Sequence, residues 1–77
     1  MSSPEVDAVI DDLLRAISDI DFQHEGDLNR IEQNVAAEEL KSYLISSKKY
    51  EYQLNRQPYV DLLNKLRRQR HRKPFGA

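Results

Sequence analysis

The sequence predicts a small all-α protein, a helical bundle of three main helices completed by self-association. Apolar residues recur at helical intervals near the start of the chain, and neither Gly nor Pro occurs from Asp27 to Gln57. In that window the Leu, Ala, Glu and Lys residues favour helix over strand. The predicted helices span about 4–22, 27–56 and 58–71, with the middle helix kinked or divided. Short connections would make successive helices antiparallel neighbours.

The first predicted helix has the clearest apolar pattern in the chain. Ser3 and Pro4 are typical of a helix start, since Ser caps the first turn and Pro presets φ at the first helical position. An apolar seam follows at intervals of four, three, four and three residues: Val6, Ile10, Leu13, Ile17 and Ile20. Beyond Phe22 the seam meets polar residues and Gly26. We therefore expect the helix to end near Phe22 and residues 23–27 to form a turn.

The middle of the chain shows a shift in its apolar pattern. No Gly or Pro interrupts the chain from Asp27 to Gln57, but after Val35 the apolar residues move to a neighbouring stripe. Its members are Ala36, Leu40, Tyr43, Ser47, Tyr50 and Leu54. Asn34 is a natural helix cap, so a kink or break is expected there. Pro58 lacks an amide proton and disfavours a helical residue before it, which predicts that the last helix begins at Pro58.

Chain length sets an expectation about assembly. The 77 residues are predicted to form a single helical domain over 1–73, followed by a flexible C-terminal tail at 74–77. A domain of this size buries only about 60% of the surface that its unfolded chain exposes. The sequence has no cysteine that could stabilise it by a disulfide. We therefore expect a homodimer or a heteromeric subunit, with the seam of the first helix as the preferred contact.

Charge is divided unequally along the chain. Residues 1–40 carry eleven acids against Arg15 and Arg30, a net charge of −9, and residues 41–77 carry ten Lys and Arg against two acids, a net charge of +8. Such asymmetry can pair the two halves, by folding back or by antiparallel association. It can also present a basic end to an anionic partner.

The basic end is the strongest functional signal in the sequence. Six cations lie within nine residues: Lys65, Arg67, Arg68, Arg70, Arg72 and Lys73. Arginines spaced along a helix can follow nucleic-acid phosphates. Against this use, Phe75 is the one aromatic residue near the run, and the whole chain has a net charge of −1. The alternative is that these cations pair with the acids of the first helix.

Metal and catalytic sites are not expected. The densest set of possible metal ligands is Asp19, Asp21, Gln23, His24, Glu25 and Asp27. It begins like an EF-hand loop, but the sixth and twelfth positions are His24 and Arg30 in place of Gly and Glu. His24 and His71 are predicted to be solvated surface residues with no nucleophile arranged near them. A helical chain of this length seldom encloses a catalytic pocket.

The functional hypothesis is a non-enzymatic protein interaction module, regulatory or structural, without cofactor, metal or small-molecule substrate. Tyr43, Tyr50, Tyr52 and Tyr59 fit packing in a core or an interface, or a protein-binding face. The alternative is a nucleic-acid-binding protein that uses its basic helix at 65–73. The start, MSSPEVD, lacks the basic and apolar regions of a signal peptide, and no apolar run approaches the roughly 20 residues of a membrane span, so a cytoplasmic location is expected.

Overall fold

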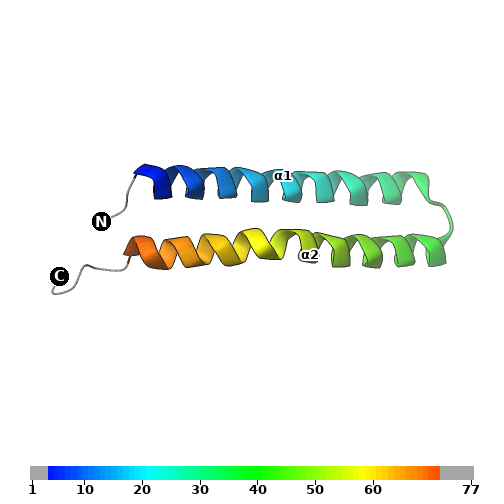
Figure 1. Cartoon of the computed structure of the whole chain (residues 1–77). Coiled ribbons are helices and arrows are strands. Elements are labelled where there is room, and N and C mark those ends of the chain that lie inside the picture. The colour runs from blue at the N-terminus through cyan, green and yellow to red at the C-terminus, as the bar shows by residue number, and fades with distance from the viewer. Residues whose placement is uncertain (1–3, 72–77) are drawn as a thin grey trace.

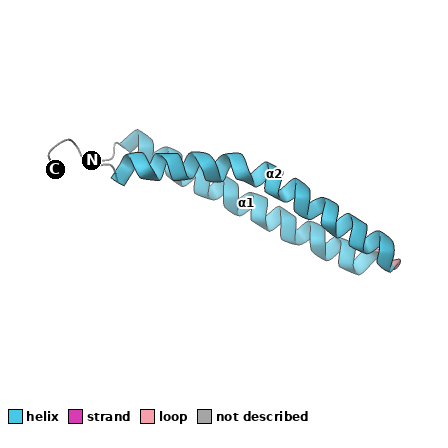
Figure 2. Cartoon of the chain, turned by 90° about the horizontal axis from the view of Figure 1, so that it is seen from below, coloured by secondary structure: helices cyan, strands magenta, loops and turns pink. Residues whose placement is uncertain are grey.

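The chain folds into a long antiparallel helical hairpin. The computed structural model describes residues 4–71, with side chains to residue 69. Helix α1 spans Pro4–Asn34 and helix α2 spans Glu38–His71. Figures 1 and 2 show the two helices side by side, forming an elongated rod. The all-α prediction is confirmed for these residues, which contain two helices in place of the expected three.

Helix α1 continues through the predicted turn at 23–27. The expected end near Phe22 is wrong, because Gly26 is helical and the helix extends to Asn34. A Gly inside a helix costs only about 1 kcal/mol relative to Ala. Continuing the helix buries Ile31, which is 9% exposed, and burial of such a side chain is worth more, about 1.5–3 kcal/mol. Packing against α2 therefore outweighs the local preference of Gly26.

The reversal of the chain lies at residues 35–37, next to the break predicted near Asn34. The amide of Val35 donates to the carbonyl of Ile31 at 3.0 Å and so closes the last turn of α1. Lys41 then spans the reversal, with its Nζ 3.6 Å from carboxylate oxygens of both Glu32 and Glu38. Because the Lys41 side chain is only 17% exposed, this ion pair with Glu32 helps to hold the two helices together at the turn.

Helix α2 also passes through a predicted boundary, at Pro58. Pro58 lies inside the helix, so the expected division between 27–56 and 58–71 is wrong. The proline removes the hydrogen bond to the carbonyl of Leu54, at a cost of about 3 kcal/mol in a helix interior. Continuing the helix keeps Val60 and Leu63 on the side that packs against α1, and Leu63 is 6% exposed. Packing of these residues against α1 therefore outweighs the local preference of Pro58 for a helix end.

The hydrophobic core lies at the open end of the hairpin. Ile10, Leu13 and Ile17 of α1 are buried with Leu63 of α2, and Val6, Val60 and Leu66 pack against this group. The predicted seam of the first helix is therefore covered by α2 of the same chain, with Ile20 half-buried beside it. The hairpin also pairs the two oppositely charged halves of the chain, because the turn brings the acidic half of the sequence beside the basic half.

Two further predictions concern the ends and the membrane. The predicted tail at 74–77 lies outside the described residues. Between residues 4 and 71, neither helix contains an apolar stretch sufficient to cross a bilayer.

Candidate functional site

An apolar stripe on α2 is left uncovered by the hairpin. Leu40, Tyr43, Tyr50 and Leu54 are 51%, 68%, 66% and 56% exposed. Together with Ser47 they are spaced by three, four, three and four residues, which places them on one line along the helix. We call these five residues the outward stripe.

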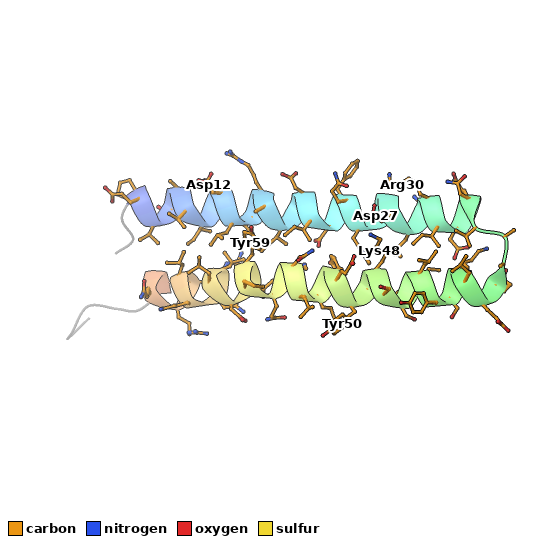
Figure 3. The ribbon with its side chains drawn as sticks, turned by 45° about the vertical axis from the view of Figure 1, so that its right-hand side comes forward. Asp12, Asp27, Arg30, Lys48, Tyr50 and Tyr59 are labelled. Atoms are coloured by element: carbon orange, nitrogen blue, oxygen red, sulfur yellow. The ribbon has the colours of Figure 1, made fainter. Side chains whose placement is uncertain are left out.

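The outward stripe points away from α1. The α2 residues that contact α1, such as Tyr52, Arg56 and Leu63, lie roughly half a turn around the helix from it. Figure 3 shows Tyr50 on the side of α2 turned away from α1, whereas Lys48 lies between the two helices. The four large apolar side chains of the outward stripe therefore remain more than half exposed within the described part of the chain.

The middle of the hairpin contains a polar cluster between the two helices. The hydroxyl of Tyr52 donates to Oδ1 of Asp21 at 2.6 Å, and Nε of Arg56 donates to the same oxygen at 2.9 Å. The ring of His24 stacks on that of Tyr52 with centroids 4.0 Å apart, so His24 is half-buried and more enclosed than the solvated surface residue that the sequence predicted. The guanidinium of Arg56 lies 5.9 Å from the centre of the Tyr52 ring, within cation–π range.

These contacts shift two ionisation equilibria in opposite directions. The hydrogen bond from Tyr52, with the Arg56 guanidinium beside it, lowers the pKa of Asp21 below its usual value. The hydrogen bond to Asp21, together with partial burial, raises the pKa of Tyr52. Both shifts favour a carboxylate and a neutral phenol at physiological pH, the protonation states in which the hydrogen bond forms.

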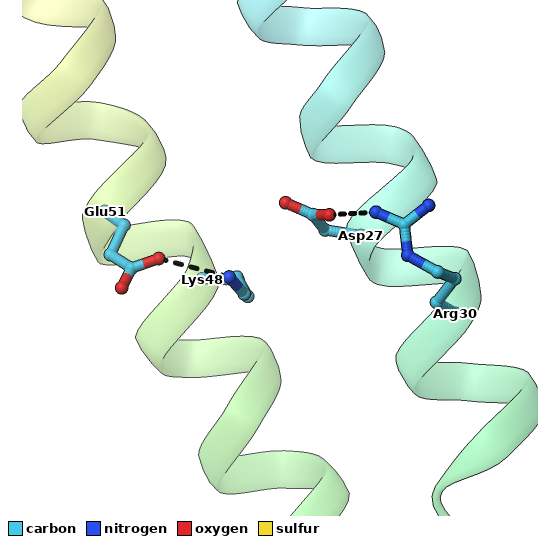
Figure 4. Close-up of polar contacts among 4 residues, drawn as sticks. All are labelled: Asp27, Arg30, Lys48 and Glu51. Atoms are coloured by element: carbon cyan, nitrogen blue, oxygen red, sulfur yellow. Dashed lines mark hydrogen bonds and ion pairs between the residues drawn. The ribbon is translucent and has the colours of Figure 1, made fainter.

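A cleft of about 320 Å³ lies beside this cluster. Its lining comes from both helices: Asp19, Ile20, Gln23, His24, Asp27, Lys48, Glu51, Tyr52 and Asn55. Two ion pairs lie at its edges, Asp27 with Arg30 on α1 and Lys48 with Glu51 on α2 at 3.4 Å (Figure 4). Since charges of both signs are paired there, the cleft offers no concentrated charge to an ionic ligand. Among residues 4–69, no three His, Asp or Glu side chains are grouped as metal ligands.

The predicted phosphate-contacting residues lie at the open end of α2. Lys65, Arg67 and Arg68 are exposed, and no ion pair seen in the described part of the chain involves them. The proposed pairing of these three with acids of α1 is therefore not seen. The side chain of Arg70, and all of Arg72 and Lys73, lie outside the described residues.

Comparison with protein families, with curated proteins and with solved structures gave no match, so the functional interpretation rests on these residues. The spacing of the outward stripe is visible in the sequence, but the sequence does not show that the stripe faces away from α1. The polar cluster was missed, because its members pair across 31 and 35 residues of sequence and no local pattern marks them.

Proposed function

We propose that this chain is a non-enzymatic protein interaction module, regulatory or structural, that presents the outward stripe of α2 to a partner helix. The observation that supports it most directly is the exposure of Tyr43 and Tyr50, each about two-thirds uncovered, on a helix whose opposite face is already packed. We place the module in the cytoplasm, where a chain without cysteine loses no disulfide to reducing conditions.

The chemistry of the outward stripe suits recognition of a helix. Leu and Tyr at heptad spacing form the row that a second helix packs into, side chain between side chains. Tyr is enriched at the residues that dominate interface energies, because it combines a large apolar surface with a hydroxyl at the rim. The seam of α1, from Val6 to Ile20, is a weaker candidate for this contact, since Ile10, Leu13 and Ile17 would have to leave Leu63 first.

A small core also favours a partner. Within the described residues, five hydrophobic side chains are buried: Ile10, Leu13, Ile17, Ile31 and Leu63. Two helices with so few buried residues obtain little stability from their own packing, and association is the usual supplement in chains of this size. A helix laid on the outward stripe would bury its four large apolar side chains without disturbing the hairpin.

Photocrosslinking tests the proposal at single-residue resolution. A photoreactive benzoylphenylalanine at Tyr50 should crosslink a protein partner in cells of the source organism, or a second copy of the chain. The same group at Phe22 provides the matched control, because Phe22 is an aromatic residue on α1 with 78% exposure, more than Tyr50. Equal crosslinking from both positions, or none from Tyr50, would contradict the proposal.

Nucleic-acid binding is the second candidate, supported by exposed Lys65, Arg67 and Arg68 at one end of α2. The acids Asp11 and Asp12 of α1 are exposed at the same end of the hairpin and oppose a polyanion. We expect weak, salt-sensitive binding to a generic DNA duplex, because neutralised phosphates release counterions.

A charge-removal experiment distinguishes this candidate. The double variant Arg67→Gln with Arg68→Gln should reduce duplex binding, whereas Lys49→Gln, an exposed cation elsewhere on α2, should not. A submicromolar complex that persists at about 0.15 M salt, and that the double variant abolishes, would place nucleic acid ahead of protein as the partner.

A further inference from the structure

We infer that the occupant of the outward stripe is a second copy of this chain, packed with its own α2 antiparallel to the first. The inference rests on the proposed function, in that the stripe binds a helix, and it adds the identity and direction of that helix. Three observations support it: the symmetry of the stripe, the area that it offers, and the distribution of charge along α2.

The outward stripe is complementary to itself when two copies run in opposite directions. With a twofold axis at the level of Lys48 and Lys49, Ser47 lies opposite Tyr50 of the second copy, and Tyr43 lies opposite Leu54. The twofold axis repeats each pair, as a closed dimer requires. The small Ser47 leaves room for the Tyr50 ring, so a large side chain meets a small one at the centre.

The helix bounds exclude a register shifted toward the turn, and the opposite shift would place Tyr43 against Asp61. In the proposed register, Leu40 lies opposite Gln57, so every stripe residue faces a position between 40 and 57, inside α2 of the second copy. Sliding the pair by one heptad toward the turn would place Leu54 opposite Ala36, which lies before the start of α2.

The uncovered side chains supply a large part of the area that a dimer needs. Two tyrosines that each bury roughly 150 Å², with Leu40 and Leu54, supply much of the roughly 800 Å² per partner that a standard interface buries. The exposed large apolar side chains of α1 are Val9, Leu14 and Phe22, separated by five and eight residues, and they form no comparable line.

Charge along α2 favours the antiparallel direction. Glu38 and Glu39 occupy the first turn, and the exposed cations Lys65, Arg67 and Arg68 lie near the other end. Antiparallel pairing brings the acidic turn of each copy toward the basic end of the other, and it opposes the two helix dipoles. Parallel pairing would place the two basic ends side by side. Beside the central layers, antiparallel pairing places Ser46 near Gln53 of the second copy. Both residues are uncharged, so no like charges meet at this position.

Sedimentation velocity of the full chain across the micromolar range tests the pairing. The wild type should shift from monomer to dimer as concentration rises. Tyr50→Glu, which inserts a charge into the central layer while keeping a good helix former, should raise the dissociation constant at least about tenfold. Phe22→Glu is the matched control and should dimerise like the wild type. Circular dichroism of each variant verifies that the helices remain.

Two outcomes would overturn the inference. The first is a monomeric wild type across that range; in this case crosslinking from Tyr50 to a protein of different sequence would still support the proposed function. The second is an equal loss of dimer in Phe22→Glu and Tyr50→Glu, which would place the contact elsewhere.

Disulfide formation tests the direction, since the natural chain has no cysteine to interfere. Leu40→Cys chains mixed with Gln57→Cys chains should form a mixed disulfide dimer on oxidation, because these positions share a layer in the antiparallel register. Each variant alone should stay largely uncrosslinked. Efficient crosslinking of Leu40→Cys with itself would show a parallel pair and overturn the inference.

Discussion

The hydroxyl of Tyr52 on α2 donates a hydrogen bond to the carboxylate of Asp21 on α1, with 2.6 Å between the oxygens. Arg56 donates to the same carboxylate oxygen, so two groups one turn apart on α2 meet a single group on α1. Sliding one helix by a turn past the other would separate all three. The polar cluster therefore fixes the alignment of the helices, which apolar packing at the open end leaves less strictly defined.

Removal of the Tyr52 hydroxyl should weaken the hairpin. Tyr52→Phe keeps the ring that stacks on His24 but loses the bond to Asp21, and we expect the free energy of unfolding to fall by about 1 kcal/mol. Tyr59→Phe is the control, because its hydroxyl forms no hydrogen bond in the described structure. Urea unfolding of both variants measures the difference. An equal effect in the two variants would show that the Asp21 contact contributes nothing.

The same pair predicts how stability depends on pH. The pKa of Asp21 is lower in the folded chain, so its contribution is present above the unfolded value of about 4 and is lost as pH falls through the folded pKa. The pKa of Tyr52 is raised, so its contribution is present below about 10 and is lost as pH rises through the folded pKa. The stability difference between wild type and Tyr52→Phe should therefore be largest between these limits and shrink at both extremes.

The size of this pH effect is limited by solvent. The side chains of Asp21 and Arg56 are 41% and 35% exposed, so screening should keep the change below about 1 kcal/mol. Urea unfolding at a series of pH values, with both proteins at the same concentration, measures it. A difference that stays constant from acid to alkaline pH would contradict the proposed coupling.

Gly26→Ala should stabilise the protein by about 0.5–1 kcal/mol, because alanine loses less backbone freedom in a helix interior. A Cβ at Gly26 would meet only the end of the flexible Arg30 side chain, at 3.6 Å. Thermal or urea unfolding measures the change, with Gly26→Pro as the opposite control that should lower stability strongly. A lower stability for Gly26→Ala would indicate that residues 23–27 form a turn after all.

Pro58→Ala should restore the backbone hydrogen bond to the carbonyl of Leu54 and raise stability by about 1–3 kcal/mol. Helical content by circular dichroism should stay the same or rise slightly. Asn64→Ala serves as the control on the same helix, since Asn64 is exposed and already donates a backbone amide. Loss of helix on replacing Pro58 would mean that the proline marks a helix boundary instead of interrupting a continuous helix.

Sequence patterns predicted much of the fold because they report which residues share a helix face. The spacing of Ile10, Leu13 and Ile17 identified the buried face of α1. Near Asn34 only a kink or break within one helix was predicted, whereas the chain reverses there. Gly26 and Pro58 misled the prediction of helix ends. The local penalty of Gly26 is smaller than the gain from burying Ile31, and the larger penalty of Pro58 is offset by the packing of Val60, Leu63 and Leu66 against α1, which depends on the opposite helix.

The candidate site was less predictable for a related reason. The heptad spacing from Leu40 to Leu54 is readable from the sequence, yet the face that α1 covers depends on Tyr52, Arg56 and Leu63 packing against it. The sequence alone favoured the seam of α1 as the intermolecular contact. In the hairpin that seam is covered, and the exposed line lies on α2.

The melting temperature as a function of protein concentration tests most directly whether the outward stripe pairs two copies. Association that favours the folded chain makes the melting temperature rise with concentration. The wild type and Phe22→Glu should both show this rise, whereas Tyr50→Glu, with its weaker pairing, should show a much smaller rise over the same concentrations. A wild-type melting temperature that stays constant from low micromolar to high micromolar concentration would contradict self-association through α2.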